Sequence, residues 1–202
     1  MTATAETSSG FALGFADYTF DAQSTFRVLL DAMARPGTIG AIGAQPEAPE
    51  PLDVATTAVA LCLFDHDTQV WLGDGVAGFA VYEYLRFHCG CPLTKASLTS
   101  DFALSIATAG VPGLAQFSPG TDEFPDRSTT LIVQVPSLEN GAPVRLTGPG
   151  IRDTAELRVA GIPDYFWAER REQQAMFPRG IDLVFTCGER LVTLPRSTEI
   201  EV

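Results

Sequence analysis

The chain has 202 residues, of which 46% are hydrophobic, and it carries a formal net charge of -12 from 25 acidic and 13 basic residues. This length and apolar content suit one globular domain with a full core and exclude an intrinsically disordered chain. The acidic balance argues against a nucleic-acid reader or a protein that binds anionic membranes, and no run approaches the roughly 18 apolar residues of a membrane span.

The first residues, MTATAETSSG, are small and polar. We predict a flexible N-terminal tail over residues 1–15, followed by a single α/β domain over residues 16–202. The start of the chain lacks the basic and apolar segments of a secretory signal, so we expect a cytoplasmic protein. In that compartment the four cysteines should be reduced thiols: Cys62, Cys89, Cys91 and Cys187.

The first predicted element is a helix within residues 20–37. Its apolar residues have the i, i+3, i+4, i+7 spacing of one buried stripe: Phe26, Leu29, Leu30 and Met33. Asp21 or Ser24 can cap its start, Arg35 suits its negative end, and Pro36-Gly37 stops it.

Helices and strands then alternate as far as residue 108. Asp53 can cap a second helix over residues 54–64, and residues 68–73 resemble a short buried strand. A third helix is expected within residues 76–89, opened by Asp74 or Gly75. This alternation favours crossover connections and therefore an α/β domain.

The second half of the chain is richer in strands. Residues 102–108 alternate in strand fashion, and residues 129–135 are β-branched enough for a central strand. Asn140-Gly141 marks a tight turn into residues 143–148, so we expect 129–135 and 143–148 to form an antiparallel hairpin.

The chain is expected to close with a helix and a second hairpin. The helix covers residues 164–177 and follows Pro163. Strands over residues 181–187 and 190–195 flank Gly188-Glu189, which suits a type II′ turn. These elements predict one α/β domain with a mixed sheet.

The loop VRLTGPGI, residues 144–151, is the first candidate site. Its glycines would let backbone N–H groups approach an anion, although Pro149 removes one donor and no Lys-Ser/Thr pair follows as in a P-loop. A plain turn is therefore the favoured interpretation. Anion binding remains the alternative, with these candidate contacts: Arg145, Thr147, Gly148, Gly150 and Arg196.

Other candidate sites have simpler explanations. The cluster His88, Cys89 and Cys91, and the exposed run Asp65-His66-Asp67, lack the paired spacing of structural zinc sites. Lys95 is the only lysine, and its setting, CPLTKAS, does not resemble a pyridoxal-phosphate pocket. We assign no catalytic residue and no metal ligand.

Several segments together carry a family resemblance. They are FRVLLDAMARPG near the start, DVATTAVALCL, RFHCGCPL, TLIVQVPSL, the loop VRLTGPGI, and FPRGIDLVFTCGERLVTLPRST at the end. In this order and spacing, the chain resembles the PhnH family, the H subunits of the bacterial carbon–phosphorus lyase system. The resemblance runs from about Phe20 to Val202. The segment before Phe11 lies outside it, and Cys89 and Cys91 are not part of its pattern.

The resemblance implies a fold, partners and a function. It implies a three-layer α/β/α sandwich with a mixed sheet, resembling a pyridoxal-phosphate-dependent transferase domain without the cofactor site. It also implies a homodimer that joins G, I and J subunits in a core complex for phosphonate catabolism.

By the same resemblance, the complex uses ATP and phosphonate and transfers alkylphosphonate, such as methylphosphonate, to ribose C1 of ATP with release of adenine. This chain would bind no cofactor and would be structural and dimerising rather than catalytic alone. The alternative is a stand-alone α/β enzyme or binding protein for a phosphorylated metabolite.

Overall fold

The computed structural model describes residues 12–201, so most of the expected tail lies outside it. The helices of the described part are α1 (Tyr18–Ala34), α2 (Val54–Leu63), α3 (Phe79–His88) and α4 (Asp164–Gln174). The strands are β1 (Gly40–Ala41), β2 (Val70–Leu72), β3 (Leu93–Thr94), β4 (Phe102–Ile106), β5 (Thr130–Gln134), β6 (Val144–Thr147), β7 (Ala155–Leu157), β8 (Asp182–Cys187), β9 (Arg190–Leu194) and β10 (Glu199–Glu201). Short 3-10 helices cover Ser97–Thr99, Ala107–Ala109, Leu114–Gln116 and Pro125–Arg127.

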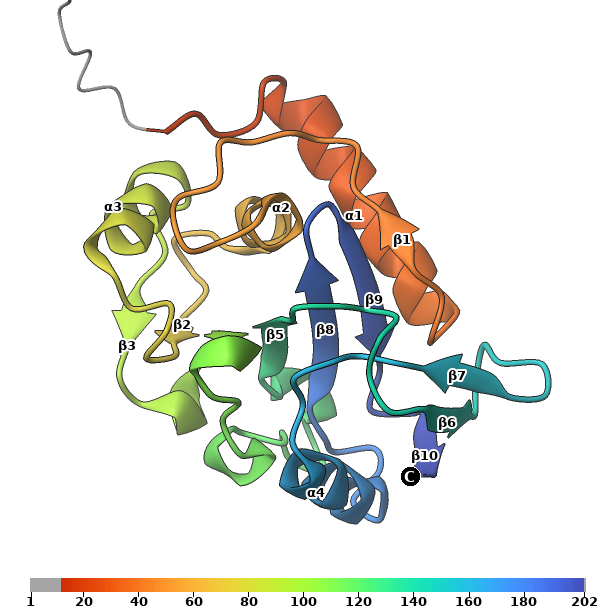
Figure 1. Cartoon of the computed structure of the whole chain (residues 1–202). Helices are drawn as coiled ribbons and strands as arrows, with labels where there is room; N and C mark the ends of the chain where they lie inside the picture. Colours follow the sequence, from red (N-terminus) through yellow and green to blue (C-terminus); the bar gives the residue numbers. More distant parts are fainter. Residues whose placement is uncertain (1–11, 202) are drawn as a thin grey trace, which may run out of the picture.

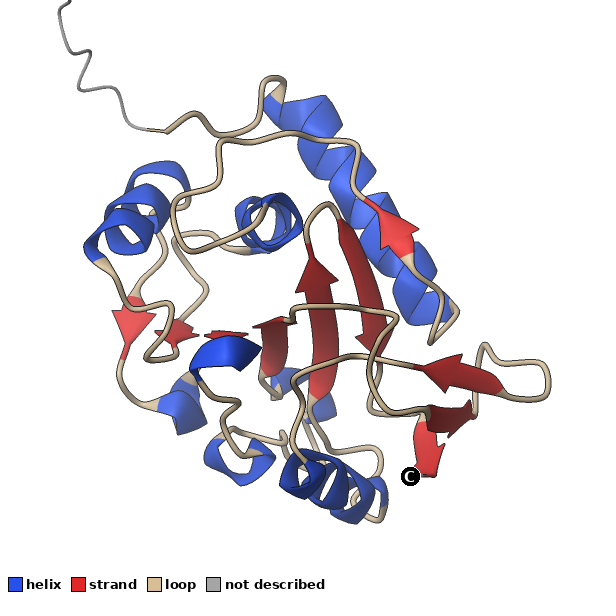
Figure 2. Cartoon of the chain, viewed as in Figure 1, coloured by secondary structure: helices blue, strands red, loops and turns tan. Residues whose placement is uncertain are grey.

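A seven-stranded mixed sheet forms the centre of the protein, as Figure 2 shows. Its strand order is β1-β9-β8-β5-β4-β2-β3. The five strands from β8 to β3 in this order are parallel to one another. β9, next to β8, runs antiparallel to both of its neighbours, β8 and β1. A separate antiparallel sheet has the order β10-β6-β7. The predicted α/β class with a mixed sheet is therefore confirmed.

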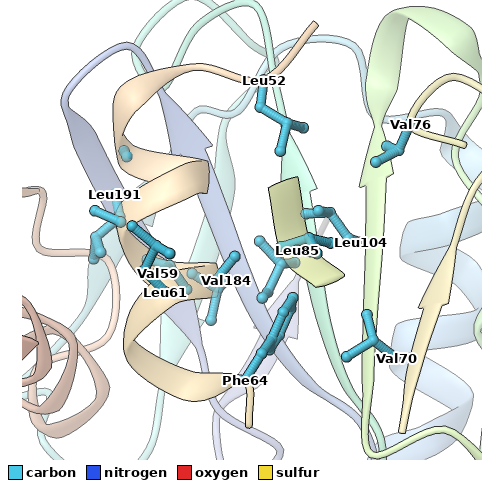
Figure 3. Close-up of a cluster of buried hydrophobic side chains, with 14 of the residues drawn as sticks. Leu52, Val59, Leu61, Phe64, Val70, Val76, Leu85, Leu104, Val184 and Leu191 are labelled. Atoms are coloured by element: carbon cyan, nitrogen blue, oxygen red, sulfur yellow. The ribbon is translucent and has the colours of Figure 1, made fainter. Parts of the chain in front are cut away.

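Two hydrophobic cores cover opposite faces of the large sheet. Val184 belongs to one core, whereas its neighbours Leu183 and Phe185 belong to the other, because successive strand residues point to opposite faces. The first core includes α1, α2 and α3, and the second includes α4 and the small sheet. Figure 1 shows this separation, and Figure 3 shows Leu85 of α3 beside Leu104 of the sheet.

The first helix begins earlier than expected and buries only part of the expected stripe. Asp17, rather than Asp21 or Ser24, is the N-cap, and its carboxylate accepts the Phe20 N–H at 3.1 Å. Phe26 and Leu30 of the expected stripe are 44% and 52% exposed. Leu29 of the expected stripe is buried and Met33 packs against the core, as predicted, and the helix also buries Thr25 and Ala32.

The second helix confirms its predicted cap, and the third corrects one. Asp53 caps α2 by accepting the Thr56 N–H at 2.9 Å. The third helix begins at Phe79 after Gly78, not at Asp74 or Gly75. The intervening residues form a separate turn, in which the N–H groups of Val76 and Ala77 both donate to the Gly73 carbonyl.

The predicted hairpin between residues 129–135 and 143–148 is wrong. β5 lies between β4 and β8 with parallel pairing, and β6 pairs with β7 and β10 in the small sheet. The burial patterns explain this separation. β5 buries Leu131, Ile132 and Val133 in succession, as an interior parallel strand does, whereas β6 alternates buried and exposed residues.

β4 is buried along most of its length, as β5 is. β4 buries four consecutive residues instead of alternating, and the chain continues from Ile106 into a 3-10 helix rather than extending the strand to residue 108. β8 and β9 form the expected hairpin, and Gly188 takes a positive φ of 60° in its turn. α4 ends at Gln174, three residues before its predicted end.

Candidate functional site

A small cavity lies at the carboxyl ends of β2 and β4. The chain leaves β2 through α3 to β3 on one side, whereas β4 lies on the other side of β2. Such a switch point is where open α/β sheets bind their ligands. The cavity has a volume of about 230 Å³, and its lining includes Asp74, Ser105 and Gln116.

A glycine-rich turn borders this cavity, and sequence analysis did not single it out. It reads GDGVAG over residues 73–78, a GxGxxG spacing between the parallel strand β2 and the helix α3. That pattern is a weak signal without its structural context. Packing accounts for the middle glycine, because a Cβ on Gly75 would overlap the side chain of Ala109.

A polar network lies at the carboxyl ends of β5 and β8. The Asp53 N–H donates to the Gln134 side-chain oxygen at 2.8 Å, and the Gly188 N–H donates to the Asp53 carboxylate at 2.6 Å. Thr56 links Asp53 at 2.6 Å to the hydroxyl of Thr186 at 2.7 Å. These groups satisfy one another, so the network ties α2 to the β8–β9 turn.

The proposed anion contacts fall in two places. Thr147 and Gly148 lie next to residues 197–199, because Thr147 pairs with Glu199 and a Cβ on Gly148 would lie 3.0 Å from the Ser197 carbonyl. Gly150 turns away, and a Cβ on it would overlap the carbonyl of Ala34 at the end of α1.

Both arginines of the proposed anion site have carboxylate partners. Arg145 is exposed on β6 and lies 3.6 Å from the Glu201 carboxylate. Arg196 is mostly buried and donates from two nitrogens to the carboxylate of Asp182, as well as to the Pro125 carbonyl. The structure therefore places the two cations in separate ion pairs, and anion contact stays a prediction.

Arg170 of α4 is a buried cation that sequence analysis missed. It is fully buried, and its Nη2 donates to the carbonyls of Pro195 at 2.6 Å and Thr198 at 3.1 Å. Burial lowers the pKa of Arg170 to about 10, which still leaves it charged at neutral pH. The polar run around it in the sequence resembles a solvated helix face, so no pattern marks it as buried.

The other candidates lie apart from the switch point. The His88 Nε2 is 2.9 Å from the Ala12 carbonyl oxygen. The thiols of Cys89 and Cys91 share a hydrogen bond, which raises the pKa of Cys89 and lowers the pKa of Cys91. Within residues 12–201, no group of three His, Cys, Asp or Glu side chains is arranged to hold a metal ion. Lys95 is exposed at the end of β3.

We expect the thiol of Cys62 to react slowly with iodoacetamide. Burial raises the pKa of Cys62 from 9.0 to about 11, so at pH 8 its thiolate fraction should be about 100-fold below that of an unperturbed thiol. Because the unfolded thiol loses its proton first, this group should make folding less favourable as the pH rises from 9 toward 11. Peptide mass spectrometry over time measures the alkylation. A rate equal to that in 8 M urea, within about a factor of three, would contradict the burial of this thiol.

None of the helices within the described residues has the length and apolar character that a membrane span requires.

The sequence of residues 13–201 matches the family described as "Bacterial phosphonate metabolism protein (PhnH)". The chain belongs to the PhnH family. Family membership places it in bacterial phosphonate metabolism and confirms the resemblance found in the sequence.

Two curated relatives extend this result. The chain is 46% identical over 204 residues to "Alpha-D-ribose 1-methylphosphonate 5-triphosphate synthase subunit PhnH" of Rhizobium meliloti (strain 1021). The aligned region covers all of this chain and 99% of the relative. It is 30% identical over 182 residues to "Putative C-P lyase subunit protein HtxG" of Stutzerimonas stutzeri, covering 89% of this chain and 86% of the relative. Both names describe a subunit of a larger enzyme.

Proposed function

We propose that this chain is a dimer-forming subunit of a cytoplasmic carbon–phosphorus lyase assembly with G, I and J partners. Together they would transfer alkylphosphonate to ribose C1 of ATP with release of adenine. The observation that carries the proposal is the 46% identity, over the whole chain, to a subunit of ribose 1-methylphosphonate 5-triphosphate synthase. The chain itself acts as a structural component.

The proposal also covers the layer arrangement of the fold and its structural relatives. Helices cover both faces of a mixed sheet, which supports a three-layer α/β/α sandwich related to pyridoxal-phosphate-dependent transferases. The residues do not fit the cofactor itself. Lys95 is the only lysine and it is exposed, whereas a Schiff base with the cofactor needs a lysine inside the pocket. No step of the proposed function passes through that cofactor.

Native mass spectrometry of the chain purified together with the G, I and J subunits tests this function. The expected result is one assembly that contains two copies of the chain. A monomer that remains free in the presence of all three partners would reject the proposal.

A second candidate is a stand-alone protein that binds a phosphorylated metabolite. The cavity at the switch point has the place of a ligand site in such sheets, although its lining contains none of the predicted anion contacts. Its anion contacts would be those predicted from the loop VRLTGPGI: Arg145, Thr147, Gly148, Gly150 and Arg196. Calorimetry of the isolated chain with ATP or methylphosphonate distinguishes the two functions. Absence of binding at millimolar ligand would exclude the second candidate.

A further inference from the structure

Two of the four cysteines lie side by side at the end of α3. Cys89 is the C-cap of the helix, Cys91 follows after a single residue, and their two thiols share a hydrogen bond. Cys62 and Cys187 donate instead to backbone carbonyl oxygens. All four are free thiols in the structure. We refer to Cys89 and Cys91 as the thiol pair.

The residue between the two thiols gives the backbone room to bring them closer. Gly90 is exposed, has a positive φ of 64°, and a Cβ on it would meet no atom within 4 Å. Residues two positions apart have Cα atoms at most about 7 Å apart, and a turn at the middle residue shortens this toward the roughly 4.4–6.8 Å of disulfides. The spacing therefore permits an S–S bond within the pair.

The shared hydrogen bond makes the two sulfurs unequal. It is the largest cause of the lowered pKa of Cys91 and, together with burial, it raises the pKa of Cys89. The Ala60 carbonyl oxygen, 4.0 Å from the Cys89 sulfur, is only a weak second acceptor. Cys89 therefore keeps its proton while negative charge develops on Cys91, and the thiolate is the form of cysteine that oxidants attack.

The position of the pair selects a small oxidant. Cys91 is 6% exposed and Cys89 is half-buried, whereas the adjoining Gly90 and Pro92 are exposed. A bulky disulfide such as oxidised glutathione has little access to a sulfur as buried as that of Cys91. Hydrogen peroxide needs much less room, so the burial favours a peroxide over a disulfide as the reactant.

We propose that the thiol pair is a peroxide-reactive site, at which Cys91 is oxidised and Cys89 converts the product to a disulfide. The Cys91 thiolate attacks one peroxide oxygen, so that an S–O bond forms, the O–O bond breaks and hydroxide leaves. The Cys89 sulfur then attacks the Cys91 sulfur, so that the S–S bond forms, the S–O bond breaks and a second hydroxide leaves. The hydroxides take up the two thiol protons, and two thiols and one peroxide give one disulfide and two waters.

The disulfide acts on the end of α3 and is readily reduced. The N–H groups of Cys89 and Gly90 both donate to the Leu85 carbonyl, at 2.9 and 3.1 Å, so movement of the two sulfurs toward each other disturbs the last turn of the helix. A ring closed across a single residue is strained, and strained disulfides are the labile ones. The dithiol is therefore the resting state and the disulfide is transient, as cytosolic disulfides usually are.

Timed treatment of the purified chain with hydrogen peroxide at pH 8, followed by alkylation and peptide mass spectrometry, tests the proposal. The expected product is one disulfide between Cys89 and Cys91, which dithiothreitol reverses. The pair should lose its thiols at least about 10-fold faster than Cys62, because a pKa of about 11 keeps the Cys62 thiol protonated.

Three variants separate the two roles within the pair. Cys89→Ser should stop the reaction at the sulfenic acid of Cys91, which dimedone traps. Cys91→Ala should abolish the disulfide and leave Cys89 unreactive on the time scale of the parent reaction. Cys62→Ser is the matched control, and it should form the disulfide at the parental rate. Thermal unfolding in reducing buffer identifies any variant that is not folded, and Cys89→Ser alters only the half-buried thiol, so it tests the proposal even if Cys91→Ala does not fold.

The outcomes that would overturn the proposal are distinct. Peroxide treatment that leaves both thiols of the pair intact, or oxidises them no faster than Cys62, excludes a peroxide-reactive site. A disulfide that joins two copies of the chain on a non-reducing gel excludes closure within the pair. A sulfenic acid on Cys91 that persists in the parent chain excludes the role of Cys89. None of these results bears on the assembly with partner subunits, so the proposed function is tested separately.

Discussion

Asp53→Ala is expected to lower the free energy of unfolding by about 2 to 4 kcal/mol. The carboxylate accepts the backbone N–H and the hydroxyl of Thr56 and the N–H of Gly188, so its loss leaves donors in two segments without their charged acceptor. The Thr56 donors are partly buried, where an unsatisfied donor costs more than at the surface, whereas the Gly188 bond is exposed. Urea denaturation monitored by circular dichroism measures the change.

Asp17→Ala supplies the matched control. Asp17 also caps a helix, by accepting the Phe20 N–H, but that bond is exposed. We expect a loss of about 1 kcal/mol, the ordinary value for an exposed N-cap. Equal losses for the two variants would show that Asp53 acts as a helix cap alone and does not join α2 to the β8–β9 turn.

Local signals predicted this part of the fold well. Asp53 is a capping residue directly before an apolar run, and Gly188 lies between two β-branched segments, so each element could be recognised from its own residues. The contact between Asp53 and Gly188 could not, because 135 positions separate them. Such a contact depends on the order of strands in the sheet, which the pattern of any one segment does not contain.

The wrong hairpin has the same origin. Asn140-Gly141 suggests a tight turn, and the two flanking segments each resemble strands. The turn signal alone does not show that β5 requires cover on both faces while β6 requires it on one. The unbroken apolar run of β5 was the available signal for a parallel interior strand.

The candidate site was less predictable than the fold. The cavity between β2 and β4 exists because the chain reverses its order there, so it follows from topology rather than from any motif. Arg170 was missed because its helix is rich in charged residues and burial depends on the turn after β9. Phe79 at the start of α3 is 83% exposed, which likewise could not be derived, since a phenylalanine beside apolar residues in a helix is normally assigned to the core.

Gly150→Ala is expected to lower the free energy of unfolding by about 3 kcal/mol or more. Gly150 has a positive φ of 82°, a backbone angle that residues with a side chain rarely adopt. A Cβ at this position would also overlap the carbonyl of Ala34. Relief of the overlap would separate the loop after β6 from the end of α1. Thermal and urea denaturation of the purified variant measure the loss.

Gly90→Ala separates the two contributions to this loss. Gly90 has a similar φ of 64°, but a Cβ there would meet no atom within 4 Å, so only the backbone strain of about 1 kcal/mol applies. The difference between the variants therefore measures the close approach of the loop to α1. If Gly150→Ala costs no more than Gly90→Ala, the loop does not pack against α1 as described. The positive φ of Gly150 would then account for the glycine by itself.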